Sequence, residues 1–88
     1  MKVLKIGASW CPGCKIMVPI WEEIEKENPW LEKEMIKVDD DPEIMKKYQL
    51  HQLPTFIFLD KEGNEITRYA GEVEKEVLVG AIKEHKDK

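Results

Sequence analysis

Apolar and polar residues follow one another in blocks that predict a β-α-β-α-β-β-α order. Apolar runs predict strands at 2–7, 35–38, 55–59 and 65–70, and the run at 55–59 is apolar enough for a strand covered on both faces. Helical spacing predicts helices at 12–28 and 73–82. A shorter helix is expected to run to about Tyr48, with Asp40 as its cap. Residues 60–64 form a predicted hairpin turn, in which Gly63 is free to take a positive φ.

This order predicts a single α/β domain over residues 1–88. The first two strands are expected to pair in parallel through a right-handed crossover, and the last two to form an antiparallel hairpin. Helices would then cover both faces of a four-stranded mixed sheet. The pattern places Met17, Val18, Trp21 and Met35 in the core.

Composition narrows the class of protein. Eighty-eight residues are too few for two cores, and an apolar fraction of 42% is too high for a disordered chain. A net charge of −4 argues against nucleic acid as the main partner. No apolar stretch is long enough for a transmembrane helix, and the N-terminus has no signal-peptide pattern. We therefore expect a cytoplasmic protein, monomeric and without contact to membranes.

The two cysteines, Cys11 and Cys14, carry the candidate chemistry. They lie where the first strand gives way to the first helix, and Pro12 suits the first turn of a helix. Unpaired N–H groups at a helix N-terminus favour a sulfur in its thiolate form, which is the species that attacks disulfides. Cys14 lies three positions later on the same helical face, within reach of the first sulfur. This spacing suits Cys11 as the exposed attacking thiol and Cys14 as the resolving thiol. Trp10 offers a flat apolar surface beside them.

Other uses of a C-x-x-C pair remain open. A structural disulfide would close a very small loop and stabilise little. Zinc would need two further ligands, and His51 and His85 match no zinc-finger spacing. Haem attachment would need a histidine where Lys15 stands. We therefore predict no metal ligands.

Leu53-Pro54-Thr55 is the second signal, directly before the most apolar strand. A cis bond before Pro54 would make a tight turn able to face the sulfurs. The backbone of Leu53 could then pair with an extended peptide by strand addition. An ordinary turn proline is the alternative.

Taken together, these motifs resemble the thioredoxin family over nearly the whole chain. The resemblance is carried by Trp10-Cys11-x-x-Cys14-Lys15, by Leu53-Pro54-Thr55 and by Gly71 after the last strand. It implies dithiol–disulfide exchange with Cys11 as nucleophile and Cys14 as resolving thiol. It also implies a cis bond at Pro54. The implied supporting residues are Trp10, Pro12, Gly13 and Lys15, and the implied substrate contacts are Trp10, Leu53, Pro54 and Gly71.

The resemblance further implies a protein that binds no cofactor and cycles between dithiol and disulfide. Its expected partners are disulfide-containing proteins and an electron donor, either a reductase of the thioredoxin-reductase type or glutathione. The alternatives are a glutaredoxin-like, glutathione-dependent reductase and a non-catalytic binding module of the same fold. Gln52-Leu53-Pro54 and Ala70-Gly71-Glu72 match the glutathione-site pattern incompletely, which favours protein disulfides.

The chain departs from the family pattern in three ways. The first strand and helix of a full-length thioredoxin are absent, which leaves the minimal topology shared with glutaredoxins. Pro12-Gly13 reverses the usual order of the central pair. Lys5 stands where the family usually has a buried acid that helps to move a proton from the resolving thiol. We expect water or another carboxylate to serve instead, or the Lys5 side chain to extend to solvent.

Overall fold

The computed structural model describes all 88 residues, and its elements follow the predicted order. The strands are β1 (Lys2–Gly7), β2 (Glu32–Lys37), β3 (Thr55–Leu59) and β4 (Glu65–Ala70), and the helices are α1 (Pro12–Glu27), α2 (Ile44–Lys47) and α3 (Lys75–His85). The sheet order is β2-β1-β3-β4. β1 is parallel to β2 and antiparallel to β3, and β3 and β4 form the antiparallel hairpin. The predicted four-stranded mixed sheet is confirmed.

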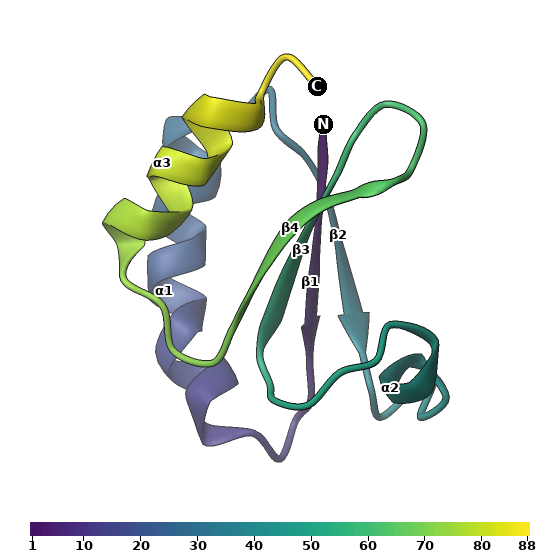
Figure 1. Cartoon of the computed structure of the whole chain (residues 1–88). Coiled ribbons are helices and arrows are strands. Elements are labelled where there is room, and N and C mark those ends of the chain that lie inside the picture. The colour runs from purple at the N-terminus through teal and green to yellow at the C-terminus, as the bar shows by residue number, and fades with distance from the viewer.

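Helices lie on both faces of this sheet (Figure 1). α1 and α3 run beside each other on one face, and the short α2 lies on the other. A buried cluster fills each side. The first joins the sheet to α1 and α3 through Val3, Met17, Trp21, Ile24, Leu31, Phe56, Phe58, Leu78, Ala81 and Ile82. The second comprises Leu4, Ile6, Ala8, Cys11, Cys14, Val38, Ile44, Leu50 and Ile57. Both cysteines therefore belong to a hydrophobic core as well as to the candidate site.

The continuous apolar run of β3 is explained by its central position. Phe56 and Phe58 belong to the first cluster and Ile57 to the second, and all three side chains are fully buried. The rings of Phe56 and Trp21 lie 5.2 Å apart, centroid to centroid. Strand β3 thus ties the two halves of the core together.

Two elements differ from their predicted bounds. β2 begins at Glu32 and most of its side chains are exposed, because it is an edge strand held by pairing with β1 and carries little apolar pattern. α2 is a single turn, and its N-cap is Glu43 with no side-chain cap. The N–H groups of Asp40 and Asp41 instead bond to the carbonyl of Lys37, so these residues form the turn that ends β2. The predicted cap at Asp40 is therefore wrong.

Burial also differs from the pattern at two apolar positions. Met35 is 57% exposed and Val18 is 41% exposed, so the prediction that both are core residues is wrong. Met35 lies on the edge strand, and Val18 lies on the side of α1 near that edge. The helices on the two faces of the sheet leave its outer edge at β2 uncovered.

The chain ends meet at the side of the sheet away from the cysteines (Figure 1). The N–H of Lys61 in the β3–β4 turn donates to the carbonyl of Lys88, and Lys61 and Met1 line one shallow hollow. None of the three helices is both long and apolar enough to cross a membrane.

Replacing Phe56 with alanine tests the role of β3 in the core. We expect Phe56→Ala to lower the free energy of unfolding by about 3–5 kcal/mol, because it leaves a cavity against Trp21. Urea denaturation measures the change. Trp30→Ala is the matched aromatic control; its ring is exposed, so the expected loss is below about 0.5 kcal/mol. Equal losses in the two variants would contradict this account of the core.

Candidate active site

The local sequence places Cys11 at the N-cap of α1. Cys11 is extended, with φ −93° and ψ 113°, and Pro12 takes the first helical position, where its missing N–H leaves nothing unpaired. The N–H of Cys14 donates to Cys11 Sγ at 3.2 Å. A sulfur therefore caps the helix in the place where serine or aspartate usually supplies an oxygen.

Both thiols are free in this structure, and both are largely covered. Cys11 is 5% exposed and Cys14 is 8% exposed. The prediction of Cys11 as the exposed thiol is wrong for this form, because the sulfur turns back under the first turn of the helix to act as its cap. Trp10, beside it, is 65% exposed. The largely covered Cys11 therefore directly follows an exposed indole ring in the chain.

The two sulfurs have different electrostatic surroundings. Burial and the side-chain hydrogen bond with Cys11 raise the pKa of Cys14 to about 11. The positive charge of Lys5 acts in the opposite direction and lowers the pKa of Cys14. Cys14 is therefore a protonated thiol at neutral pH, and its backbone N–H donates a hydrogen bond to the sulfur of Cys11.

The Leu53–Pro54 loop lies directly against the start of α1. Leu53–Pro54 is a cis bond, as the resemblance implied. A methyl group placed on Gly13 would lie 3.4 Å from Pro54 Cδ and 3.6 Å from the carbonyl oxygen of Leu53. The N–H of Gly71 donates to the carbonyl of Pro54 at 2.8 Å, which fastens the segment after β4 to the same loop. The fold thus brings Gly13, Leu53, Pro54 and Gly71 together.

Gly71 occupies a position that other residues would strain. Its φ is +83°, and a Cβ there would lie 2.5 Å from the side-chain nitrogen of Gln52. A side chain at this position would meet both an unfavourable backbone conformation and an adjacent amide. The backbone of residue 71 can therefore lie close to the loop only because it is glycine.

Asp39 is an anchor that the sequence analysis did not find. Its carboxylate accepts hydrogen bonds from the backbone N–H of Ser9, at 2.9 Å, and from the Ser9 hydroxyl. These bonds lower the pKa of Asp39. β1 and β2 are parallel, so the residues that follow them lie at the same edge of the sheet. The predicted parallel pairing could therefore have indicated that Ser9 and Asp39 lie close together. Asp39 thus holds the loop that carries Trp10 and Cys11.

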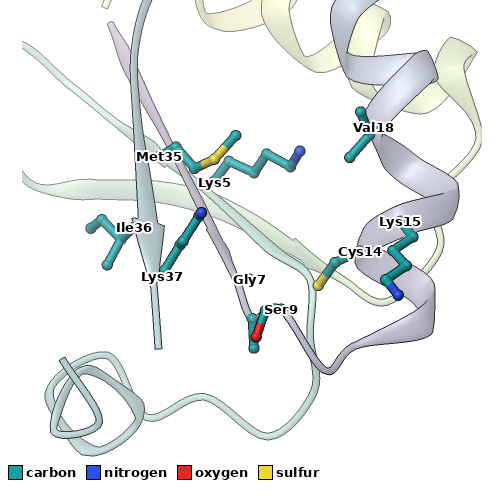
Figure 2. Close-up of a pocket in the computed structure, with 10 residues that line it drawn as sticks. Lys5, Gly7, Ser9, Cys14, Lys15, Val18, Met35, Ile36 and Lys37 are labelled. Atoms are coloured by element: carbon teal, nitrogen blue, oxygen red, sulfur yellow. The ribbon is translucent and has the colours of Figure 1, made fainter. Parts of the chain in front are cut away.

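A pocket of about 310 Å³ lies behind Cys14, between β1, β2 and α1 (Figure 2). Its lining residues are Lys5, Gly7, Ala8, Ser9, Cys14, Lys15, Val18, Met35, Ile36 and Lys37. Lys5 is only 5% exposed, but its amine is not among the buried nitrogen atoms without a partner, so the side chain buries its stem and extends its end to solvent, as one of the two expectations had it. No three His, Cys, Asp or Glu side chains lie close enough together to hold a metal ion.

Comparison with known proteins agrees with this geometry. The family model for thioredoxin matches residues 1–82. The chain belongs to the thioredoxin family. A thioredoxin of Chlamydia pneumoniae is 35% identical over 78 residues, which cover 89% of this chain and 76% of that protein.

Solved thioredoxins share the fold. The thioredoxin of Fasciola hepatica superimposes with a TM-score of 0.84 at 33% identity, covering 96% of this chain and 79% of that one. Thioredoxin 1 of Thermosipho africanus gives a TM-score of 0.81 at 30% identity and covers 99% and 96% of the two chains. The predicted thioredoxin-like fold and thiol–disulfide oxidoreductase activity are confirmed at the level of the family.

The anchor at Asp39 predicts an acid-sensitive contribution to stability. Because its pKa is lowered in the folded state, the carboxylate stabilises the fold above the ordinary aspartate value of about 3.9. This stabilisation disappears as the pH falls through the lowered pKa. We expect Asp39→Asn to lower the melting temperature at neutral pH, with the difference from the wild type vanishing in acid. Asp40→Asn, next in the chain and without a side-chain hydrogen bond, should change little; equal effects in both variants would contradict the anchor.

The raised pKa of Cys14 predicts slow alkylation. The thiolate fraction of Cys14 should rise about tenfold per pH unit up to about pH 11. Iodoacetamide labelling of the reduced protein, followed by peptide mapping, measures the rate at this cysteine. If the labelling rate instead levels off above about pH 8.5, the ordinary pKa of cysteine, burial does not control the ionisation of this thiol.

Proposed function

We propose that this thioredoxin-family protein reduces disulfides in other proteins, with Cys11 as the nucleophile and Cys14 as the resolving thiol. One observation carries the assignment of roles. The N–H of Cys14 points at Cys11 Sγ at 3.2 Å, whereas Cys14 itself is a buried thiol with a pKa near 11. The Cys14 N–H orients the Cys11 sulfur at the start of the helix, and burial opposes the thiolate at Cys14.

The first step is attack on the substrate disulfide. Cys11 thiolate displaces one substrate sulfur, which leaves as a thiolate and takes a proton from solvent. A mixed disulfide then joins Cys11 to the other substrate sulfur. In the second step Cys14 loses its proton and attacks Cys11 Sγ. The Cys11–Cys14 bond forms, and the second substrate thiolate departs, so that two electrons have passed to the substrate.

The surface around Cys11 suits an extended peptide. The N–H and carbonyl of Leu53 take part in none of the chain's own backbone hydrogen bonds outside its helices and strands. These two groups lie beside the first turn of α1 and are available to pair with a substrate strand. The exposed indole of Trp10, next to Cys11 in the chain, adds an apolar contact surface. We assign substrate contact to Trp10, Leu53, Pro54 and Gly71.

The remaining site residues support the sulfurs. Pro12 starts the helix, Gly13 allows the close approach of the Pro54 loop, and Lys15 adds positive charge beside Cys14. Two cysteines suffice to carry the electrons, so the cycle needs no bound cofactor. A reductase of the thioredoxin-reductase type or a small thiol such as glutathione would restore the dithiol. We propose that the protein works as a monomer in the cytoplasm, where thiols stay reduced.

Cysteine variants separate the two roles. Cys11→Ser should abolish reduction of a disulfide-bonded protein substrate such as insulin. Cys14→Ser should still attack once and then accumulate the mixed disulfide, which mass spectrometry detects as an adduct. An adduct formed through Cys14 in the Cys11→Ser variant, at a rate equal to that of Cys11, would reverse the assignment.

The reduction potential distinguishes a reductant from the alternatives. The protein is titrated in thiol–disulfide buffers while the fluorescence of Trp10 is monitored. We expect a reduction potential of about −270 mV, as for thioredoxin. A value of about −120 to −200 mV would favour an oxidising or glutaredoxin-like role. Two thiols that never form a disulfide would favour a binding module.

A further inference from the structure

The pocket behind Cys14 is lined by a lysine, Lys5, that projects from the middle of β1. Figure 2 shows the Lys5 side chain leaving β1 toward α1, with its amine near Val18. Lys5 is 5% exposed overall, but no buried nitrogen lacks a hydrogen-bond partner, so the stem of the side chain is buried while its amine keeps contact with solvent. Its register neighbours in the sheet are Met35 on β2 and Phe56 on β3, neither of which carries a charge.

A lysine in the middle of a strand that faces a helix is uncommon, because its stem must be buried while its charged end stays hydrated. The pocket lining includes Lys15 and Lys37 in addition to Lys5, and it contains no Asp or Glu. Among the lining residues, only Cys14 carries an acidic group, its thiol. Lys5 and the thiol that must lose its proton in the resolving step therefore line the same pocket.

We propose that Lys5 is a positioning residue for the resolving step, in which its ammonium group stabilises the Cys14 thiolate. The proposal rests on the assignment of Cys14 as the resolving thiol. Cys14 gives its proton to solvent, and its thiolate attacks Cys11 Sγ in the mixed disulfide. The Cys11–Cys14 bond forms while the Cys11–substrate bond breaks, and the electron pair leaves with the substrate thiolate. Lys5 remains protonated throughout and gives up no bond.

The electrostatic surroundings of Lys5 support this role. Burial lowers the pKa of Lys5, and the charge of Cys14 is the first of the opposing influences, ahead of Glu25 and Glu22. In return, Lys5 lowers the pKa of Cys14. The groups whose charge acts on Lys5 are Cys14, Glu25 and Glu22, all from α1, and Lys15 and Lys37 line the same pocket. An interaction inside this pocket is screened less than one at the surface.

The expected effect has a defined size and pH dependence. If removing the charge raises the pKa of Cys14 by about one unit, the thiolate fraction at neutral pH falls about tenfold. The more basic thiolate is about threefold more nucleophilic, so the resolving rate falls about threefold. As the pH rises and Cys14 ionises in both proteins, this difference narrows.

A single stopped-flow experiment measures both steps on the intact protein. Reduced protein is mixed with dipyridyl disulfide, a neutral reagent that releases one coloured thiopyridone on attack by Cys11 and a second on resolution by Cys14. We expect Lys5→Met to leave the first phase unchanged and to slow the second about threefold at pH 7 for each unit of pKa change. Lys5→Arg, which keeps the charge, should restore the second phase.

Lys37→Met is the matched control, because Lys37 lines the same pocket but is exposed. It should leave the second phase close to that of the wild type. The proposal is overturned if Lys5→Met resolves at the wild-type rate across the pH range. It is also overturned if the loss is the same at every pH, since that would indicate misplacement of Cys14. Absence of a second phase in the wild-type protein would instead contradict the assignment of Cys14 itself.

Discussion

The hydrogen bond from the Cys14 N–H to Cys11 Sγ joins folding to chemistry. The sulfur of Cys11, which we propose as the nucleophile, caps α1 and is oriented by the backbone that it helps to organise. Two neighbouring segments hold the start of α1 in place. Asp39 holds the preceding loop through Ser9, and the Pro54 loop lies against the first turn at Gly13. A small chain can therefore place two thiols accurately without a large scaffold.

The parallel pairing of β1 with β2 explains where this site lies. Both strands end at the same edge of the sheet, and the loops that follow them carry Ser9 and Asp39. The central strand β3 starts at that edge, directly after Pro54. Three segments that are distant in sequence meet there because the sheet order places β1 between β2 and β3. The site is a consequence of topology as much as of the C-x-x-C motif.

Much of this could be predicted from sequence, where a local pattern decides the outcome. The bounds of β1 and β3 agree with the predicted runs because these strands carry strong apolar patterns, and those of the more weakly patterned β4 agree because the hairpin turn and Gly71 delimit it. β2 was placed too late because an edge strand is held by its neighbour and can consist mainly of exposed residues. The Ser9–Asp39 bonds were missed because they depend on contacts between segments that are distant in sequence. The covered sulfur of Cys11 depends on helix capping, which composition does not reveal.

The position of the chain ends has a practical meaning. Residues 1 and 88 lie near the β3–β4 turn, on the side of the sheet away from the sulfurs (Figure 1). A tag, an anchor or a second module attached at either end would project away from the surface that meets substrate. Because the ends are close together, a short linker could join them and new termini could be opened elsewhere. The protein is thus suited to insertion as a redox-active domain into larger fusion proteins.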